Sequence, residues 1–273
     1  MTTLQLIKAA LAEDIGKGDI TSQLLIPARQ QAVGHIRARA PGVLAGIRVC
    51  EQVFRTVDPR TRFWARLQDG SRFRKGTVLA VVAGRARSLL AAERTALNFL
   101  QHLSGIATLT WKFVRAIRGT RAVLLDTRKT TPGLRRLEKY AVRCGGGKNH
   151  RQGLYDQILI KDNHIVAAGS LAEALHRVAG RPFEVEVRNL AELRTALAAG
   201  ARRIMLDNMS LAQMRRAVEL VSGRAELEAS GGINLKRVRA VALTGVDYIS
   251  VGTITHSAPA VDIAFDLVRK RRP

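Results

Sequence analysis

The spacing of apolar and polar positions changes character near residue 120. Before that point, Leu4, Ile7, Ala10 and Leu11 recur at helical spacing, and a glycine-punctuated turn follows. Between residues 32 and 84, breaks such as Pro-Gly and Asp-Gly separate short strand-like runs: AVGHIRA, GVLAG, RFWARL and TVLAVVAG. One helical piece near residues 47–57 interrupts them. This half of the chain is expected to form a small α/β layer.

Residues 86–118 carry the longest helical pattern in the chain, with apolar residues recurring at intervals of three and four. Gly105 is expected to divide this stretch into two helices, because glycine disfavours a helix interior. Arg94 and Asn98 lie one turn apart on the same face. Both side chains are therefore expected to reach one neighbouring site.

After Gly119 short apolar strands alternate with amphipathic helices, which favours a parallel sheet or barrel. The strand runs are AVLLD, QILIK, FEVEV, RIMLD, LEAS and YISVG. Each run closes on a polar or small residue: Asp126, Lys161, Glu186, Asp207, Ser230 and Gly252. In a βα barrel these positions ring the carboxyl-terminal mouth, where catalytic residues lie. Only six or seven βα units fit between residues 120 and 256, so the predicted class is α/β with an incomplete, open barrel.

A basic stretch runs from Leu124 to Ile165 between two of these strands. A helix face exposed to water accounts for part of it: Arg135, Arg136 and Lys139. Other basic residues instead follow strand ends or the triple glycine, where a scaffold presents functional groups: Arg128, Lys129, His150, Arg151 and Lys161. These five predict a site for anions.

Two glycine pairings follow the last two strands. Ser230-Gly231-Gly232 and Val251-Gly252-Thr253 stand where barrels hold phosphate on backbone N–H groups. Glu186 and Asp207 close neighbouring strands on the same mouth, and carboxylates there bind Mg²⁺ or sugar hydroxyls. The alternative is a structural salt bridge to a barrel cation. A phosphorylated sugar with Mg²⁺ would use the glycines, the carboxylates and the cations together.

Composition narrows the class of protein. The chain has 273 residues, 47% of them hydrophobic, and can bury a large core. Its formal charge of +23 would ordinarily indicate nucleic acid, but the 45 basic residues are scattered through nearly every segment. Aromatic residues make up only 4%, too few for base stacking, so we expect no nucleic-acid partner. We also expect no membrane span and a cytoplasmic protein with two reduced cysteines, Cys50 and Cys144.

Long motifs in the chain closely resemble one enzyme family. They are DTRKTTPGLRRLEKYAVRCGGGKNHRQGLYDQILIKDNHI, AERTALNFLQHLSGIAT, IMLDNM, EASGGI and ISVGTITHSAP. They resemble nicotinate-nucleotide pyrophosphorylase (carboxylating), also called quinolinate phosphoribosyltransferase. The resemblance runs from EDIGKGDIT to the carboxyl end.

This resemblance implies a type II phosphoribosyltransferase fold. An amino-terminal α/β sandwich, residues 1–105, would carry the carboxyl-terminal tail 257–273, beside an open barrel of about seven strands, residues 106–256, that holds the active site. It also implies a homodimer, or a hexamer of dimers, in which each site borrows residues from the neighbouring subunit.

The family transfers phosphoribose from 5-phosphoribosyl 1-diphosphate to quinolinate with Mg²⁺, releasing diphosphate and CO2 and giving nicotinate mononucleotide for NAD synthesis. By resemblance, Arg128, Arg151 and Lys161 hold the quinolinate carboxylates, and Arg94 of the other subunit completes the clamp. The implied catalytic residues are Lys129, Glu186 and Asp207, and the last two are also the implied metal residues. The remaining implied substrate-binding residues are Thr127, His150, Ser230, Gly231, Gly232, Val251, Gly252 and Thr253.

Two features depart from the family pattern. Arg188 stands where the family usually has a third acid after EVEV, and APGVLAG replaces a commoner acidic turn. Arg188 is expected to reorganise the charge beside Glu186. The runner-up enzyme is the sister family encoded in molybdenum-transport operons, which shares the fold and much of the basic pocket. The non-enzymatic alternative is a basic nucleic-acid-binding protein on the same fold.

Overall fold

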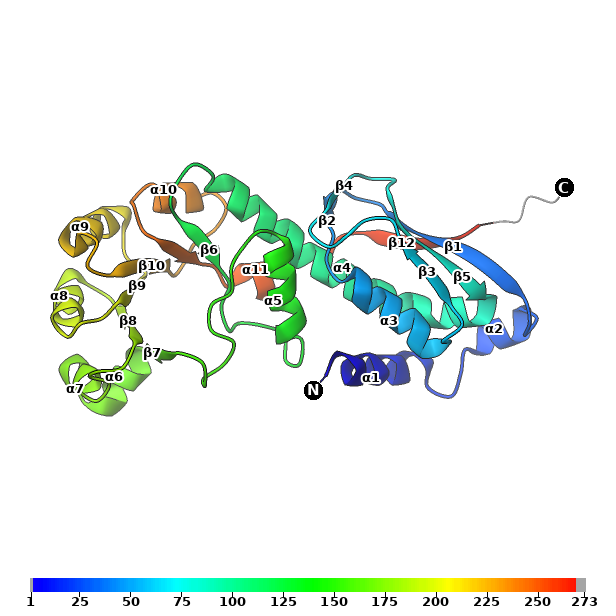
Figure 1. Cartoon of the computed structure of the whole chain (residues 1–273), viewed down its shortest axis with the longest axis horizontal. Helices are drawn as coiled ribbons and strands as arrows, with labels where there is room; N and C mark the ends of the chain where they lie inside the picture. Colours follow the sequence, from blue (N-terminus) through cyan, green and yellow to red (C-terminus); the bar gives the residue numbers. More distant parts are fainter. Residues whose placement is uncertain (1, 269–273) are drawn as a thin grey trace. The chain divides into compact units, whose positions relative to one another are not determined.

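A computed structural model describes residues 2–268 and divides them into two compact units (Figure 1). The first unit contains the described residues up to Leu109, together with Thr131–Gly146 and the described residues from Ala258 onward. The second contains Thr110–Thr130 and Gly147–Ser257. Residues 131–146 thus pack with the first unit, although they lie within the 106–256 range expected for the barrel.

The first unit is an antiparallel sheet covered by helices. Its four-stranded sheet has the order β12-β1-β5-β3. The strands are β1 (Gln31–Ala38), β3 (Arg62–Ala65), β5 (Val78–Arg85) and β12 (Ile263–Leu267), and a second pair joins β2 (Gly42–Val43) to β4 (Arg72–Phe73). The helices are α1 (Thr3–Ile15), α2 (Ile20–Leu25), α3 (Ile47–Val57), α4 (Ala86–Ala116) and α5 (Arg135–Cys144).

Helices α1, α3 and α4 bury their apolar faces against this sheet (Figure 1). Ile7 of α1, Phe54 of α3 and Leu97 of α4 join one core cluster with Ile36 of β1 and Leu79 of β5. Fully burying a side chain of this kind contributes roughly 1.5–3 kcal/mol. The predicted α/β layer is therefore present, and β12 joins it because its pairing with β1 satisfies that strand's edge. Of the predicted tail 257–273, residues 269–273 lie outside the described part.

The prediction that Gly105 divides the long helix is wrong, because α4 runs unbroken through it. A Cβ atom added at Gly105 would lie 2.2 Å from the backbone oxygen of Pro259. Glycine is needed there so that the segment leading to β12 can cross the helix closely, and this packing outweighs its helix penalty of about 1 kcal/mol.

The second unit is the open α/β barrel that the alternation predicted. Its parallel sheet has six strands in the order β6-β11-β10-β9-β8-β7. They are β6 (Val123–Leu125), β7 (Ile158–Ile160), β8 (Phe183–Val187), β9 (Arg203–Asp207), β10 (Glu226–Ser230) and β11 (Tyr248–Ser250). On the free side of β6, Lys148 forms a single parallel bridge with Leu125, in the position that a seventh strand would occupy.

Helices cover the outer face of this curved sheet (Figure 1). They are α6 (Asp162–Ala168), α7 (Leu171–His176), α8 (Leu190–Ala198), α9 (Leu211–Val221) and α10 (Val238–Ala242), whereas the short helix α11 (Thr253–His256) lies at the carboxyl-terminal ends of the strands. Three of the helices begin with a side-chain cap, since Ser170, Asn189 and Ser210 each accept a backbone N–H of the first turn. The carboxyl-terminal strand ends therefore stay open on the inner side, where a site can form.

One feature of the basic stretch differs from expectation. Arg136 is exposed on α5, as predicted for a water-facing helix, but Lys139 is fully buried in the first unit. Residue 139 falls on the apolar side of α5, next to the buried Glu138 and Ala141.

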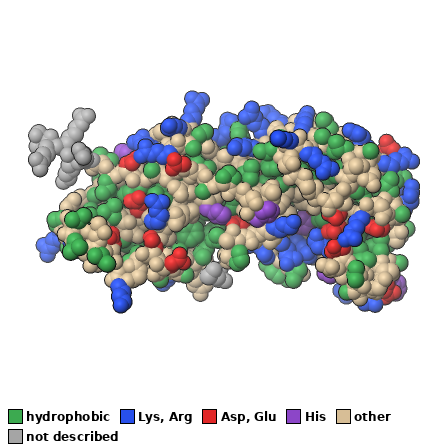
Figure 2. All heavy atoms as spheres, turned by 180° about the vertical axis from the view of Figure 1, so that it is seen from behind, with side chains coloured by type: hydrophobic (Ala, Val, Ile, Leu, Met, Phe, Trp, Pro, Cys, Tyr) green, Lys and Arg blue, Asp and Glu red, His purple; other side chains and the backbone are tan. Residues whose placement is uncertain are grey.

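The face of the molecule drawn in Figure 2 carries many Lys and Arg side chains that do not form one stripe. On the face drawn in Figure 2 they are spread widely, with Asp and Glu side chains between them. No helix in the range 2–268 is long and apolar enough to span a bilayer.

Candidate active site

A cavity of about 750 Å³ opens at the carboxyl-terminal ends of the strands of the second unit. It is lined by every predicted site residue except Arg94: Thr127, Arg128, Lys129, His150, Arg151, Lys161, Glu186, Asp207, Ser230, Gly231, Gly232, Val251, Gly252 and Thr253. Arg94 lies exposed on α4, in the first unit. Strand ends far apart in sequence thus meet at one mouth, as the strand pattern predicts.

The basic side of this cavity is built by the loops that follow β6 and precede β7. Asp126, fully buried at the end of β6, accepts hydrogen bonds from the His150 backbone N–H at 2.8 Å and from Asn149 Nδ2 at 2.5 Å. Thr255 donates to the backbone oxygen of Lys129 at 2.7 Å. These bonds fix the loops that carry Arg128, Lys129 and Arg151.

Arg128 and Arg151 repel each other inside the cavity. Burial and the charge of Arg128 both lower the pKa of Arg151, which is 7% exposed. Arginine stays charged despite such a shift. A bound carboxylate would offset this repulsion and replace lost water, so the pair is arranged to receive an anion.

The acidic side contains Glu186 and Asp207, on the neighbouring strands β8 and β9. Lys161 Nζ lies 2.7 Å from Glu186 Oε2, so the salt bridge considered as an alternative from the sequence is present. Asp207 accepts a hydrogen bond from Asn208 Nδ2 at 3.0 Å. A buried carboxylate beside Lys161 keeps that ammonium oriented into the cavity until a ligand arrives.

Arg188 does not pair with Glu186. Its guanidinium lies 2.9 Å from Asp162 Oδ2, and its backbone N–H donates to Glu192. The expectation that Arg188 reorganises the charge beside Glu186 is therefore not met in this structure, where Lys161 is the ion-pair partner of Glu186.

The glycine loops also line the cavity. Gly231 has a φ of +93°, and a Cβ atom added there would lie 2.2 Å from Asn208 Oδ1. Asn208 itself has a φ of 53° and donates its backbone N–H to Ser230. The loops after β9 and β10 thus interlock, and the missing side chain at Gly231 lets the backbone approach a bound group closely.

Two family models together cover nearly all of the chain. Residues 106–266 match the model described as "Quinolinate phosphoribosyl transferase, C-terminal domain", and residues 19–104 match the corresponding N-terminal domain. The chain belongs to the quinolinate phosphoribosyltransferase family. The resemblance seen in the motifs is therefore confirmed, and with it the predicted fold.

Individual relatives agree with this family. The chain is 47% identical to the nicotinate-nucleotide pyrophosphorylase [carboxylating] of Mycobacterium leprae, over 96% of this chain and 95% of that protein. It is 45% identical to a probable nicotinate-nucleotide pyrophosphorylase [carboxylating] of Bacillus subtilis, over 96% of this chain and 92% of that protein. A crystal structure of nicotinate-nucleotide pyrophosphorylase from Ehrlichia chaffeensis superposes with a TM-score of 0.94 at 40% identity, covering 98% of this chain and 99% of that one.

Sequence reasoning missed two acids in the interior of this phosphoribosyltransferase barrel. Glu184 and Glu228 are fully buried, and their carboxylate oxygens lie 3.2 and 3.6 Å from His150 Nε2. Both belong to runs in which acids alternate with apolar residues, FEVEV and ELEAS. Side chains two apart on a strand share a face, so Glu184 could have been placed inside the barrel from Glu186.

Glu228 makes stability depend on pH. Burial and the nearby charge of Glu184 raise the pKa of Glu228 to about 7. The folded protein therefore holds a proton that the unfolded chain has lost above about pH 4.3, and this group's contribution to stability falls as pH rises from there to about 7. Each pKa unit corresponds to about 1.4 kcal/mol.

We expect Glu228→Gln to remove that dependence. The difference in free energy of unfolding, variant minus wild type, should increase with pH between about 4.5 and 7 and then level off. Denaturant titrations at several pH values measure it. A difference that stays flat across this range would show that Glu228 ionises normally in the folded protein.

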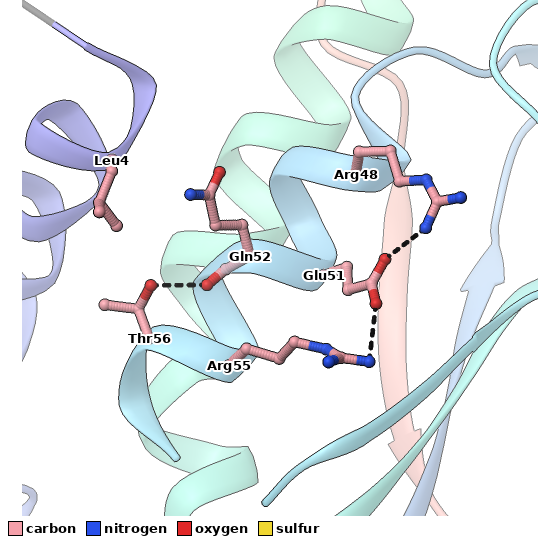
Figure 3. A pocket seen from close by; sticks show the side chains of 6 residues that line it. All are labelled: Leu4, Arg48, Glu51, Gln52, Arg55 and Thr56. Carbon is pink, nitrogen blue, oxygen red and sulfur yellow. Dashed lines mark hydrogen bonds and ion pairs between the residues drawn. The ribbon is translucent and has the colours of Figure 1, made fainter. Parts of the chain in front are cut away.

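A second, smaller cavity lies in the first unit between α1 and α3 (Figure 3). Arg48 and Arg55 face it, but both pair with Glu51, at 2.9 and 3.0 Å. These two arginines share the one carboxylate of Glu51, so this cavity has fewer cations available to an anion than the cavity of the second unit. The two cysteines are free thiols, and burial raises the pKa of both, to about 11 for Cys144, so neither is a thiolate nucleophile.

Proposed function

We propose that this enzyme is a quinolinate phosphoribosyltransferase. It would convert quinolinate and 5-phosphoribosyl 1-diphosphate to nicotinate mononucleotide, diphosphate and CO2 in de novo NAD biosynthesis. The observation that carries the proposal is a single cavity in which Arg128, Arg151 and Lys161 face the carboxylate pair Glu186 and Asp207. Family membership supports the same reaction.

The cationic side matches a dicarboxylate. In this proposal Arg128, Arg151 and Lys161 bind the two carboxylates of quinolinate, and Lys161 exchanges its bond with Glu186 for one with the substrate. The negative charges of two carboxylates can offset the repulsion between Arg128 and Arg151, whereas an uncharged ring could not. Thr255 donates a hydrogen bond to the backbone oxygen of Lys129 and so holds that residue in place. In this proposal the Lys129 side chain extends the cationic side of the cavity toward the diphosphate.

The acidic side matches the charge that develops during transfer. The pyridine nitrogen forms a bond to the anomeric carbon of ribose while the carbon–oxygen bond to diphosphate breaks, and the electron pair leaves with diphosphate. Glu186 and Asp207 would stabilise the positive ribosyl centre, and the basic residues would stabilise the departing anion. The Gly231 and Gly252 loops would hold the 5-phosphate on backbone N–H groups.

Decarboxylation follows from the new positive charge on the ring. Once its nitrogen is alkylated, the adjacent ring carbon can lose CO2, because the cationic ring stabilises the electron pair left on that carbon. A proton then takes the place of the carboxylate. No serine, histidine and aspartate triad is needed for this sequence of steps.

We also propose Mg²⁺ as the metal. When bound, Mg²⁺ would neutralise the diphosphate and help it leave. Asp207 is partly exposed on the cavity wall, and one or two carboxylates together with substrate phosphates form a usual Mg²⁺ site. Asp207 would hold the ion directly or through water, with Glu186 next to it.

The variant Asp207→Asn tests whether Asp207 acts on the ribose and the metal ion and not on quinolinate. We expect it to weaken binding of 5-phosphoribosyl 1-diphosphate far more than binding of quinolinate, because the carboxylate acts on the ribose and the metal. Calorimetry with each substrate measures both affinities, and EDTA should abolish turnover. Equal losses for the two substrates would instead assign Asp207 a structural role.

We propose further that the enzyme acts as a homodimer in the cytoplasm, with Arg94 of one subunit completing the site of the other. Arg94 is exposed on α4 and makes no ion pair among the described residues, which leaves it available to a partner's ligand. Free cysteines accord with a reducing compartment.

A further inference from the structure

A closed chain of contacts surrounds Arg151 at the inner wall of the cavity. The Arg151 guanidinium donates to the backbone oxygen of Gln157 at 3.1 Å. The Gln157 side chain donates to Glu184 Oε2 at 2.9 Å, and that oxygen lies 3.2 Å from His150 Nε2. The other ring nitrogen, His150 Nδ1, accepts the Arg151 backbone N–H at 2.7 Å. The circuit thus returns to the residue where it began.

Because the circuit is buried, losing any one of its contacts is costly. Glu184 is fully buried, and the side chains of His150 and Arg151 are almost so. In such surroundings a lost partner leaves a polar group unsatisfied, which costs more than the same loss at the surface. Glu184 is the only member that joins the Gln157 segment to the His150 ring, so both the main chain and the side chain of Arg151 depend on it.

The hydrogen bond from the Arg151 backbone N–H to His150 Nδ1 limits where the ring can be protonated. Burial lowers the pKa of His150, whereas its contact with Glu184 and the charges of Glu228 and Glu184 raise it, with a net upward direction. The Arg151 N–H occupies the position that a second ring proton would need, and this opposes the imidazolium form. Nδ1 is therefore the unprotonated ring nitrogen, and the ring proton is on Nε2, which lies 3.2 Å from Glu184 Oε2 without an aligned hydrogen bond.

We propose that Glu184, acting through His150 and Gln157, is a positioning residue that holds Arg151 ready for a substrate carboxylate. The inference rests on the proposed function in one respect, the assignment of Arg151 to the carboxylates of quinolinate. Glu184 itself touches no substrate in this account. It fixes the position of the Arg151 side chain before the substrate binds, and so reduces the conformational entropy that this side chain loses on binding.

Divalent metal binding is the competing explanation. His150, Glu184 and Glu228 offer ligand atoms within 4.8 Å of one another. A metal ion on Nε2 would need the lone pair of that nitrogen, yet Nδ1 already accepts an amide hydrogen, so the ring would have to lose both protons. The geometry therefore favours the positioning role.

The test compares Glu184→Ala, Glu184→Gln and Gln157→Ala with wild type, using calorimetry for each substrate separately. Glu184→Ala and Gln157→Ala should weaken quinolinate binding by about ten- to a hundredfold, the range for a lost hydrogen bond to a charged group. Binding of 5-phosphoribosyl 1-diphosphate should change less than about twofold. Glu184→Gln keeps an acceptor oxygen and should lie between wild type and Glu184→Ala.

Glu226→Gln is the matched control. Glu226 is another barrel acid, but its bonds run to Arg203 and Tyr248, and no described bond joins it to the Arg151 circuit. It should bind both substrates as wild type does. Wild-type quinolinate affinity in Glu184→Ala and Gln157→Ala, or an equal loss for both substrates, would overturn the positioning role.

A second measurement does not depend on the substrate. Nitrogen-15 NMR of the imidazole should show the Nε2–H tautomer of His150 in the wild-type protein, and a slowly exchanging Arg151 guanidinium that Glu184→Ala makes fast-exchanging. If wild-type protein fails to bind quinolinate, the proposed function fails, and the NMR result still decides the positioning role. A stoichiometric divalent ion in purified wild type that is lost from Glu184→Ala would replace that role with a metal site.

Discussion

Replacing Arg151 or Lys161 by alanine should lower kcat/KM for quinolinate by about a hundredfold or more. Each side chain is assigned to a substrate carboxylate in the cavity, and truncating one partner of a hydrogen-bonded charge pair costs about 2–5 kcal/mol. Lys161→Ala also leaves the buried Glu186 without its cation, which adds repulsion toward the anionic substrate. Steady-state kinetics with quinolinate as the varied substrate measure the loss.

Arg216→Ala provides the control for loss of one positive charge. Arg216 is exposed on α9 and pairs with Glu219 one turn away, so its removal should leave kcat/KM close to wild type. If folded Arg151→Ala and Lys161→Ala proteins both keep near-normal kcat/KM, the carboxylate clamp is assigned to the wrong residues.

Mixing two inactive variants should restore about a quarter of wild-type activity if sites are shared in a twofold dimer. The Arg94→Ala variant lacks the residue that we propose contributes to the partner's site. The Lys161→Ala variant lacks a residue of the site in its own subunit. Random exchange makes about half the dimers mixed. Each mixed dimer then has one site with both residues and one site with neither.

The outcome depends on where Arg94 acts. If Arg94 serves its own chain, every site in the mixture lacks one residue and mixing restores nothing. Native mass spectrometry should confirm that subunits have exchanged. No recovery after confirmed exchange would contradict the shared site and leave the proposed reaction unaffected.

The ends of the parallel strands were predictable because each short strand has a recognisable pattern in the sequence. An apolar run such as ILI or IML closes on one polar residue, and in βα units that residue must face the mouth. The strand pattern therefore predicted that Lys161, Glu186 and Asp207 lie at one mouth, and all three line the cavity. The glycine pairs were predictable for a similar reason, since Gly231 takes a backbone conformation that other residues avoid.

Features that depend on tertiary contacts were not predictable. The sequence predicted a helix break at Gly105, yet helix α4 continues through this residue. Glycine is needed there because the backbone of Pro259 crosses the helix closely. Lys139 reads as a surface charge in a basic run, yet α5 turns it to the buried side. The circuit through Gln157, Glu184 and His150 joins residues up to 34 positions apart by their side chains, and no local pattern records such a connection.

The most direct test of the proposed reaction is its product. Purified protein should be incubated with Mg²⁺, 5-phosphoribosyl 1-diphosphate and carboxyl-labelled quinolinate. We expect nicotinate mononucleotide, labelled CO2 and diphosphate in equal amounts, with none formed from nicotinate in place of quinolinate, because one carboxylate cannot engage the whole clamp. Absence of nicotinate mononucleotide and of labelled CO2 from active-site-intact, folded protein would contradict the assignment.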